Sequence, residues 1–204
     1  MMKKFLIMVV AVMMAAVSVN AQNKVEDLRH EIGVTYGLGA SLVGDGIGNG
    51  LSNGIFDSLM GRRWVNQKDF GTLSVEYFYH LNDPRAALGA IVCYSQTGED
   101  VEDIDMKIVG SRMRKYFTLM PSFKYYWVNK DYFGTYSKAA LGVTYLNYNE
   151  EANGGASRSD SNLYFAWQAS LIGIEAGIPN LRAFLEVGAG EQGVIYFGGI
   201  KVKF

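Results

Sequence analysis

The chain of 204 residues has one cysteine, three prolines and a low share of charged residues. A single cysteine excludes both an intramolecular disulfide framework and a metal site built from several thiolates. Charged residues make up 19% of the chain, less than the roughly 25% of an average soluble domain. The formal net charge is −1, and the lysines and arginines are scattered, so the sequence has no electrostatic footprint for nucleic acid.

Glycine and aromatic residues are abundant instead, with 24 Gly, 13 Tyr, 11 Phe and 3 Trp, and 49% of the chain is hydrophobic. That composition excludes a disordered tail, a coiled coil and a collagen-like rod. The length suits one domain or at most two.

The N-terminal segment has the features of a secretory signal peptide. Lys3 and Lys4 precede an apolar run over residues 5–17, and small or apolar residues lead up to Ala21. This order predicts cleavage between Ala21 and Gln22. The run is shorter than the roughly 20 apolar residues that a membrane-spanning helix needs. We therefore expect a signal peptide over residues 1–21 and a mature domain over residues 22–204.

After this segment, no stretch approaches 18 consecutive apolar residues, so no later membrane-spanning helix is expected. Apolar and polar residues alternate with period two instead, as in β-strands that have one apolar face. In residues 71–81, for example, Leu73 and Val75 fall on one face and Ser74 and Glu76 on the other. The alternation predicts eight strands, at about 30–42, 71–81, 85–96, 112–128, 132–148, 162–177, 181–189 and 194–204.

The connections between these strands alternate in length. Those at 43–70, 97–111 and 149–161 are long, and those at 82–84, 129–131 and 178–180 are short. Long loops at one end, short turns at the other and an even number of strands are typical of outer-membrane barrels. We therefore expect an all-β fold: an eight-stranded antiparallel up-and-down transmembrane β-barrel with long extracellular loops and short periplasmic turns.

Periodicity alone does not say which face points outward, and a soluble secreted barrel of the lipocalin type remains an alternative. Aromatic residues near the strand ends of the apolar face favour lipid contact. The opposite face carries charges of both signs, which suit salt bridges in a narrow lumen. A bulge near Gly173 is required to bring Glu175 to that face. The predicted lumen ion network consists of Glu31, Glu76, Arg114, Lys124, Lys138, Glu175, Arg182, Glu186, Lys201 and Lys203.

The last strand alternates apolar residues and ends in phenylalanine, at Tyr196, Gly198, Ile200, Val202 and Phe204. This pattern resembles the C-terminal signal that the barrel-assembly machinery recognises in bacterial outer-membrane barrels. Together with segments such as RHEIGVTYGLG and LEVGAGEQGVIYFGGIKVKF, it is similar to the outer-membrane β-barrel domain family, small Gram-negative proteins that are mostly uncharacterised. The resemblance covers nearly all of the mature chain. It implies a bacterial outer-membrane location and contact with lipid and the assembly machinery, but it supplies no catalytic residues.

Function is then expected on the loops or in the lumen. Side chains just fill an eight-stranded barrel, which argues against a general diffusion porin. A lipid-modifying enzyme would need a histidine near the outer leaflet, whereas His30 and His80 both fall at the predicted periplasmic end. We expect a non-enzymatic monomer with no catalytic, cofactor or metal residues, whose loops serve a structural role or meet an unknown extracellular partner. A small-solute channel and an outer-leaflet lipid enzyme remain alternatives.

The acidic loop at 97–111 raises the question of Ca²⁺ binding, since it holds several carboxylates close together. It lacks the Asp/Asn and Gly spacing of a calcium loop, so a solvated acidic loop is the preferred interpretation.

Overall fold

The computed structural model describes residues 28–37, 63–102, 108–152, 157–193 and 195–204. The predicted signal peptide, its cleavage site at Ala21 and Gln22, and residues 38–62 lie outside these ranges. Eight strands are present: β1 (His30–Gly37), β2 (Arg63–His80), β3 (Ala86–Glu102), β4 (Ile108–Asn129), β5 (Phe133–Ala152), β6 (Ser157–Ile178), β7 (Leu181–Gly190) and β8 (Ile195–Lys203).

The strands form one closed barrel in sequence order, and every neighbouring pair is antiparallel. The ring closes where β1 pairs with β8, in a register that places Thr35 opposite Gly199. The predicted all-β, eight-stranded up-and-down fold is therefore confirmed. Within the described ranges, no helix is long and apolar enough to cross a membrane.

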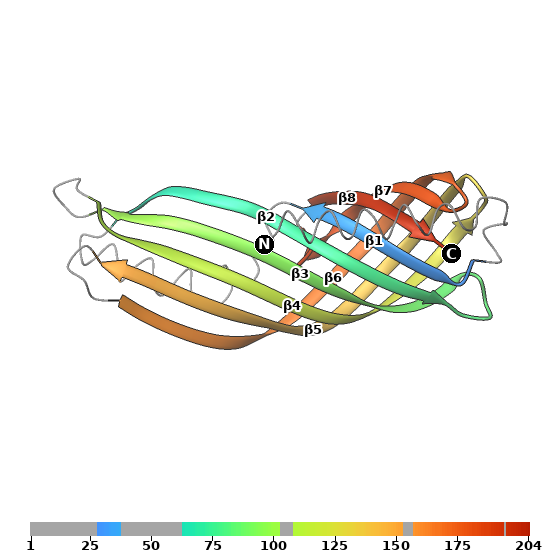
Figure 1. Ribbon diagram of the computed structural model, residues 1–204. Coiled ribbons are helices and arrows are strands. Elements are labelled where there is room, and N and C mark those ends of the chain that lie inside the picture. Colours follow the sequence, from blue (N-terminus) through green and yellow to red (C-terminus); the bar gives the residue numbers. More distant parts are fainter. Residues whose placement is uncertain (1–27, 38–62, 103–107, 153–156, 194) are drawn as a thin grey trace.

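Strand length divides the barrel into two parts. β2 to β6 contain 17 to 22 residues each, whereas β1, β7 and β8 contain 8 to 10. The three short strands are neighbours in the ring, so β2 to β6 continue well beyond them at one end (Figure 1). We call this extension the protruding sheet; among the described residues, its two edges are residues 63–69 of β2 and residues 157–166 of β6.

The protruding sheet corrects the predicted loops. Most of 97–111 and 149–161 belongs to strands, because β3 continues to Glu102, β4 begins at Ile108, β5 continues to Ala152 and β6 begins at Ser157. β2 likewise begins at Arg63, inside the loop predicted at 43–70. The alternation of apolar and polar residues weakens in these segments, although the backbone pairing persists. Alternation of apolar and polar residues reveals a strand only where one of its faces is apolar. It does not reveal paired strands whose two faces are both polar.

The two faces of the barrel have opposite polarity. Large apolar side chains point outward and are exposed, including Leu171 at 76% and Phe165 at 69%. Charged side chains point inward and are buried, including Lys124 at 0% and Arg182 at 1%. The arrangement is the reverse of a water-soluble protein, in which charged residues are almost never fully buried unless they are paired.

A bulge in β6 keeps this division of faces intact. The pairing of β6 with β7 shifts register between Ser170 and Ile172, so Leu171 and Ile172 are both exposed while Glu175 is buried. The predicted bulge is confirmed, one or two residues before Gly173. Gly173 itself is packed against the ring of Tyr136.

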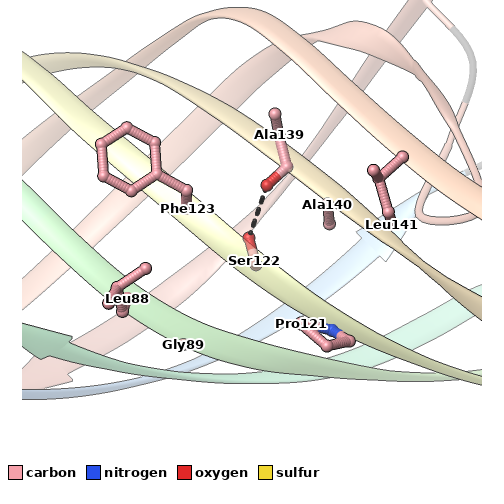
Figure 2. A pocket seen from close by; sticks show the side chains of 8 residues that line it. All are labelled: Leu88, Gly89, Pro121, Ser122, Phe123, Ala139, Ala140 and Leu141. Atoms are coloured by element: carbon pink, nitrogen blue, oxygen red, sulfur yellow. Dashed lines mark hydrogen bonds between the residues drawn. The ribbon is translucent and has the colours of Figure 1, made fainter.

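The outer face carries one shallow hollow across β3, β4 and β5, with a volume of about 410 Å³. Figure 2 shows the residues that line it: Leu88 and Gly89 of β3, Pro121, Ser122 and Phe123 of β4, and Ala139, Ala140 and Leu141 of β5. Pro121 has no N–H to donate, and the β4–β5 ladder is interrupted between the Leu119–Val143 and Ser122–Ala140 pairs. The hollow thus lies beside a local break in the ladder.

Closure of the barrel depends on a glycine at the β1–β8 seam. A Cβ atom at Gly199 would collide with the carbonyl oxygen of Val34 on β1. We expect Gly199→Val to prevent closure, because the obstacle is backbone rather than a flexible side chain. After refolding into detergent micelles, the variant should lose the faster-migrating folded band on gels of unboiled samples.

Gly98→Val is the matched control, since the nearest atom to a Cβ at Gly98 is the Arg112 carbonyl oxygen at 4.0 Å. It should retain the folded band. A Gly199→Val protein that folds as well as the control would show that the seam tolerates a side chain.

Candidate functional site

The most distinctive feature of the interior is a cluster of charged residues that we call the lumen ion network. Each member occupies an inward position of the period-two pattern and is at most 2% exposed. The members come from seven of the eight strands: Glu31, Glu76, Lys124, Lys138, Glu175, Arg182, Glu186, Lys201 and Lys203.

One half of the network is a chain of alternating charges. Lys124 Nζ lies 2.5 Å from Glu31 Oε1 and 3.4 Å from Glu76 Oε1. Lys138 Nζ lies 2.9 Å from the other oxygen of Glu76 and 2.8 Å from Glu186 Oε1. Both lysines therefore lie between two carboxylates, so β1, β2, β4, β5 and β7 are joined across the lumen.

The other half is centred on Glu175, which the β6 bulge turns inward. Its carboxylate is paired with Lys201, Arg182 and Lys203, the last at 2.9 Å. Arg182 also donates to the carbonyl oxygens of Lys130 and Asp131 at 2.6 and 2.9 Å, which ties the network to the β4–β5 turn. Lys201 lies 3.4 Å from Glu31, and this contact joins the two halves.

Neutral side chains complete the network. The hydroxyl of Tyr126 lies between two carboxylates, 3.0 Å from Glu31 and 3.1 Å from Glu175, and can donate to either. The hydroxyl of Tyr136 donates to Glu186 at 2.8 Å. His80 Nε2 lies 3.2 Å from Glu31. Lys124 Nζ also lies 3.8 Å from the centre of the Phe78 ring, a favourable cation–π contact.

Compensation of charge explains how this cluster can be buried. Four carboxylates meet four lysines and one arginine, so the network carries one excess positive charge when His80 is neutral. Each ion alone would be too costly to remove from water, and only mutual pairing with additional hydrogen bonds offsets that cost. Chemically, the network crosslinks the strands and fills the lumen. It contains ion pairs and phenols, and within it His80 contacts Glu31.

The structure brings together nine of the ten residues predicted for the lumen network and places Arg114 elsewhere. Arg114 also points inward, but it belongs to the protruding sheet, where it lies 3.6 Å from Glu99. Tyr126, Tyr136 and His80 are further members that the prediction did not include. Their inward parity was readable from the sequence, but the prediction counted only charged residues.

The predicted C-terminal signal residues occupy two environments. Tyr196 and Ile200 are exposed on the outer face, whereas Val202 is fully buried. The Phe204 ring stacks on His30 at 5.5 Å between centroids. His30 also has its Nδ1 2.8 Å from the Tyr77 hydroxyl, which places it in an aromatic cluster at the barrel end.

The acidic segment predicted as a loop at 97–111 holds Glu99 on the inward face of β3, where Arg112 and Arg114 are its neighbours at 3.9 and 3.6 Å. In the parts of the chain that the structure describes, no three His, Cys, Asp or Glu residues are grouped so that they could hold a metal ion.

A second polar group lies in the turn between β7 and β8. Glu191 is 7% exposed, and its backbone N–H donates to the carbonyl oxygen of Trp167 at 3.1 Å. Burial raises the pKa of the Glu191 carboxyl to about 7, and no described lysine, arginine or histidine lies within ion-pair distance of it. Unlike the network carboxylates, Glu191 is buried with no cation next to it among the described residues.

Removal of one carboxylate should destabilise the lumen ion network. Glu31 is the best choice, because Lys124, Lys201, Lys203 and Tyr126 all contact it. We expect Glu31→Gln to lower the free energy of unfolding by about 3 kcal/mol or more, since it leaves buried cations uncompensated. Urea titration in micelles, followed by tryptophan fluorescence, measures the effect.

Asp83→Asn, in the exposed β2–β3 turn, is the charge-matched control and should shift the midpoint little. Adding Lys124→Met to Glu31→Gln should recover part of the loss. Equal stability of Glu31→Gln and wild type would contradict the role of the network.

The raised pKa of the buried Glu191 carboxyl should make the free energy of unfolding depend on pH. The pKa of this carboxyl in the folded chain, about 7, lies above its ordinary value of 4.5, so the unfolded chain loses this proton first and stability falls as pH rises from about 4.5 to 7. The glutamine of the Glu191→Gln variant does not titrate, so the variant does not lose stability in this way. Its free energy of unfolding should therefore rise relative to wild type by up to about 3 kcal/mol between pH 4 and pH 8. A constant difference across this pH range would contradict the assignment.

Comparisons with known proteins are sparse. No protein-family model matches the chain, and no curated protein matches it. Among solved structures, the chain is similar to Ail, the attachment invasion locus protein of Yersinia pestis, determined in complex with the heparin analogue sucrose octasulfate. The TM-score is 0.42 and the identity 16%, over 86% of this chain and 97% of that chain. A likeness at this level assigns no function, which must be argued from the geometry of this chain.

Proposed function

We propose that this chain is an integral outer-membrane β-barrel without enzymatic activity, whose lumen is closed by the ion network and whose protruding sheet binds a partner outside the cell. The observation that carries the proposal is the inverted polarity of the barrel. Its outer face exposes leucine, phenylalanine and isoleucine, while nine charged side chains are buried inside.

Lipid is the environment that suits such an outer face. β7 and β8 contain 10 and 9 residues, and a tilted strand needs about 9–11 residues to cross the hydrocarbon layer. Trp127 lies two residues from the end of β4, and Tyr196 lies one residue from the opposite end of the barrel on β8. Both are more than 60% exposed, as expected for interfacial aromatic residues.

The soluble lipocalin-like alternative fits poorly. A lipocalin needs an interior that accepts a ligand and an outer face that water wets. Here salt bridges occupy the interior, and an apolar patch much larger than a few hundred Å² would face water.

The channel and enzyme alternatives are also less well supported. The network bridges opposite walls of the barrel, for example β1 to β4 and β2 to β5, so a solute would have to break buried ion pairs to pass. His30 and His80 contact Tyr77 and Glu31 respectively. These contacts suit structural roles better than proton transfer to a substrate.

The protruding sheet supports a recognition role. Among the described strands, none pairs with residues 157–166 of β6 on the side where β7 would continue, or with residues 63–69 of β2 on the side of β1. The backbone N–H and C=O groups of such an edge form a template for an added strand. An extended segment of a partner protein could bind there by β-augmentation. Recognition would then use the sheet rather than isolated loops.

The test combines location, folding and conductance. Wild-type protein should be found in the outer-membrane fraction, and its unboiled form should migrate faster than its boiled form. In planar bilayers it should give no conductance above the lipid baseline. Folded protein in the soluble periplasmic fraction would contradict the membrane assignment, and stepwise channel openings would contradict the closed lumen.

A shortened variant separates the sheet from the barrel. Residues 147–161 can be replaced by an Asn-Gly turn, because Leu146 and Asn162 already pair and this dipeptide favours a tight hairpin. The variant should still insert and show the folded band. If it fails to insert while wild type succeeds, the protruding sheet serves barrel assembly rather than recognition alone.

A further inference from the structure

The turn between β7 and β8 folds into the lumen rather than away from it. Gly37 occupies an inward position at the end of β1, and a Cβ atom there would collide with the carbonyl oxygen of Gln192. On the other side, the backbone N–H of Gln192 donates to Gln168 Oε1 on β6 at 2.8 Å. The turn therefore bridges β6 and β1 across the inside of the barrel.

This position lies directly beyond the lumen ion network. Gln168 is the inward residue next to Ser170, whose hydroxyl donates to Glu186 of the network. On the other side of the turn, β2 to β6 continue into the protruding sheet (Figure 1). The turn thus separates the closed, charged lumen from the outer part of the molecule.

Polar groups at this turn lack partners. Gln192 is fully buried, and neither its side-chain oxygen nor its NH₂ group has a hydrogen-bond partner. Gln168 is 1% exposed, and its NH₂ group also has no partner. Buried polar groups are nearly always satisfied in native proteins. These two amides therefore require an explanation, as does the buried, unpaired carboxylate of Glu191.

Backbone strain occurs in the same place. Ile195 follows the turn with a φ of 74°, a conformation that β-branched residues rarely adopt. Strain and unsatisfied groups that occur together are typical of binding sites, where a ligand supplies the missing contacts.

The missing contacts define the chemistry of the ligand. The Glu191 carboxylate would pair with a positive charge, and the two NH₂ groups would donate to acceptor oxygens. A divalent metal fits poorly, because the site offers a single carboxylate, whereas calcium sites in proteins combine several oxygen ligands. A small organic cation that carries both an ammonium and a hydroxyl group offers these two kinds of partner in one molecule.

We propose that Glu191, Gln168 and Gln192 form a binding site for a small hydroxylated ammonium compound at the outer end of the lumen. Glu191 pairs with the ammonium group, and the amides of Gln168 and Gln192 bond the hydroxyl oxygen. The site stands independently of whether the protruding sheet recognises a partner.

The experiment uses the full mature chain, ¹⁵N-labelled and folded in micelles, with ethanolamine as the probe. The side-chain NH₂ signals of Gln168 and Gln192 should shift saturably as ethanolamine is added. Two matched compounds separate the contributions: ethylene glycol has hydroxyls without charge, and sodium chloride has a cation without hydroxyls. Neither should reproduce the shifts at the same concentration.

Glu191→Gln should weaken ethanolamine binding by about tenfold or more, the loss of one charge-assisted hydrogen bond. Asp83→Asn removes a carboxylate at the opposite end of the barrel and should leave the affinity unchanged. Gln192→Met tests the amide without altering charge and should also weaken binding, which keeps the test decisive if Glu191→Gln does not fold. Unsaturable shifts, equal shifts with ethylene glycol or sodium chloride, or wild-type affinity in Glu191→Gln would each overturn the proposal.

Discussion

Compensation of charge inside the barrel is the condition on which the rest of the structure depends. The outer face of the closed barrel is apolar, and the charged residues of the lumen ion network point inward, away from it. Inside, carboxylates and cations alternate so that each has an oppositely charged neighbour within hydrogen-bond or ion-pair distance. Without this pairing, burial of the ions would oppose closure of the sheet.

The same condition sets the length of the barrel proper. β7 and β8 extend only as far as the network and the turn that covers it, and β1 is described up to Gly37, whereas β2 to β6 continue. In the protruding sheet the inward residues no longer face a complete ring, and Arg114 pairs locally with Glu99 instead of joining the central cluster. Five continuous strands therefore run through both the closed, crosslinked barrel and the protruding sheet.

Period-two alternation predicted most of this arrangement, because strand side chains alternate strictly between faces. It identified the inward direction of Glu31, Lys124 and Lys201, and the anomalous position of Glu175 correctly indicated a bulge in β6. Alternation gives the face of a residue but not its height along the barrel. It could therefore not distinguish Arg114 from the network residues, and it could not show that β3 continues into a polar ladder up to Glu102.

The turn at Glu191 was beyond sequence reasoning for a different reason. Its inward fold depends on the glycine at position 37 and the amide of Gln168, which lie far away in the chain. Nothing in the local sequence distinguishes it from an ordinary connecting turn.

The contrast between the network and this turn bears on function. Every charged residue of the network has at least one oppositely charged neighbour, which suits a structural element. At the turn, by contrast, a carboxylate without a cation, a fully buried amide without partners and a strained isoleucine lie within a few residues of one another. Natural sequences generally avoid unpaired buried groups and strained backbone, and the cases that persist tend to lie at functional sites. By this criterion, we place the proposed ligand site at the boundary between the closed lumen and the protruding sheet, next to the ion network that crosslinks the strands.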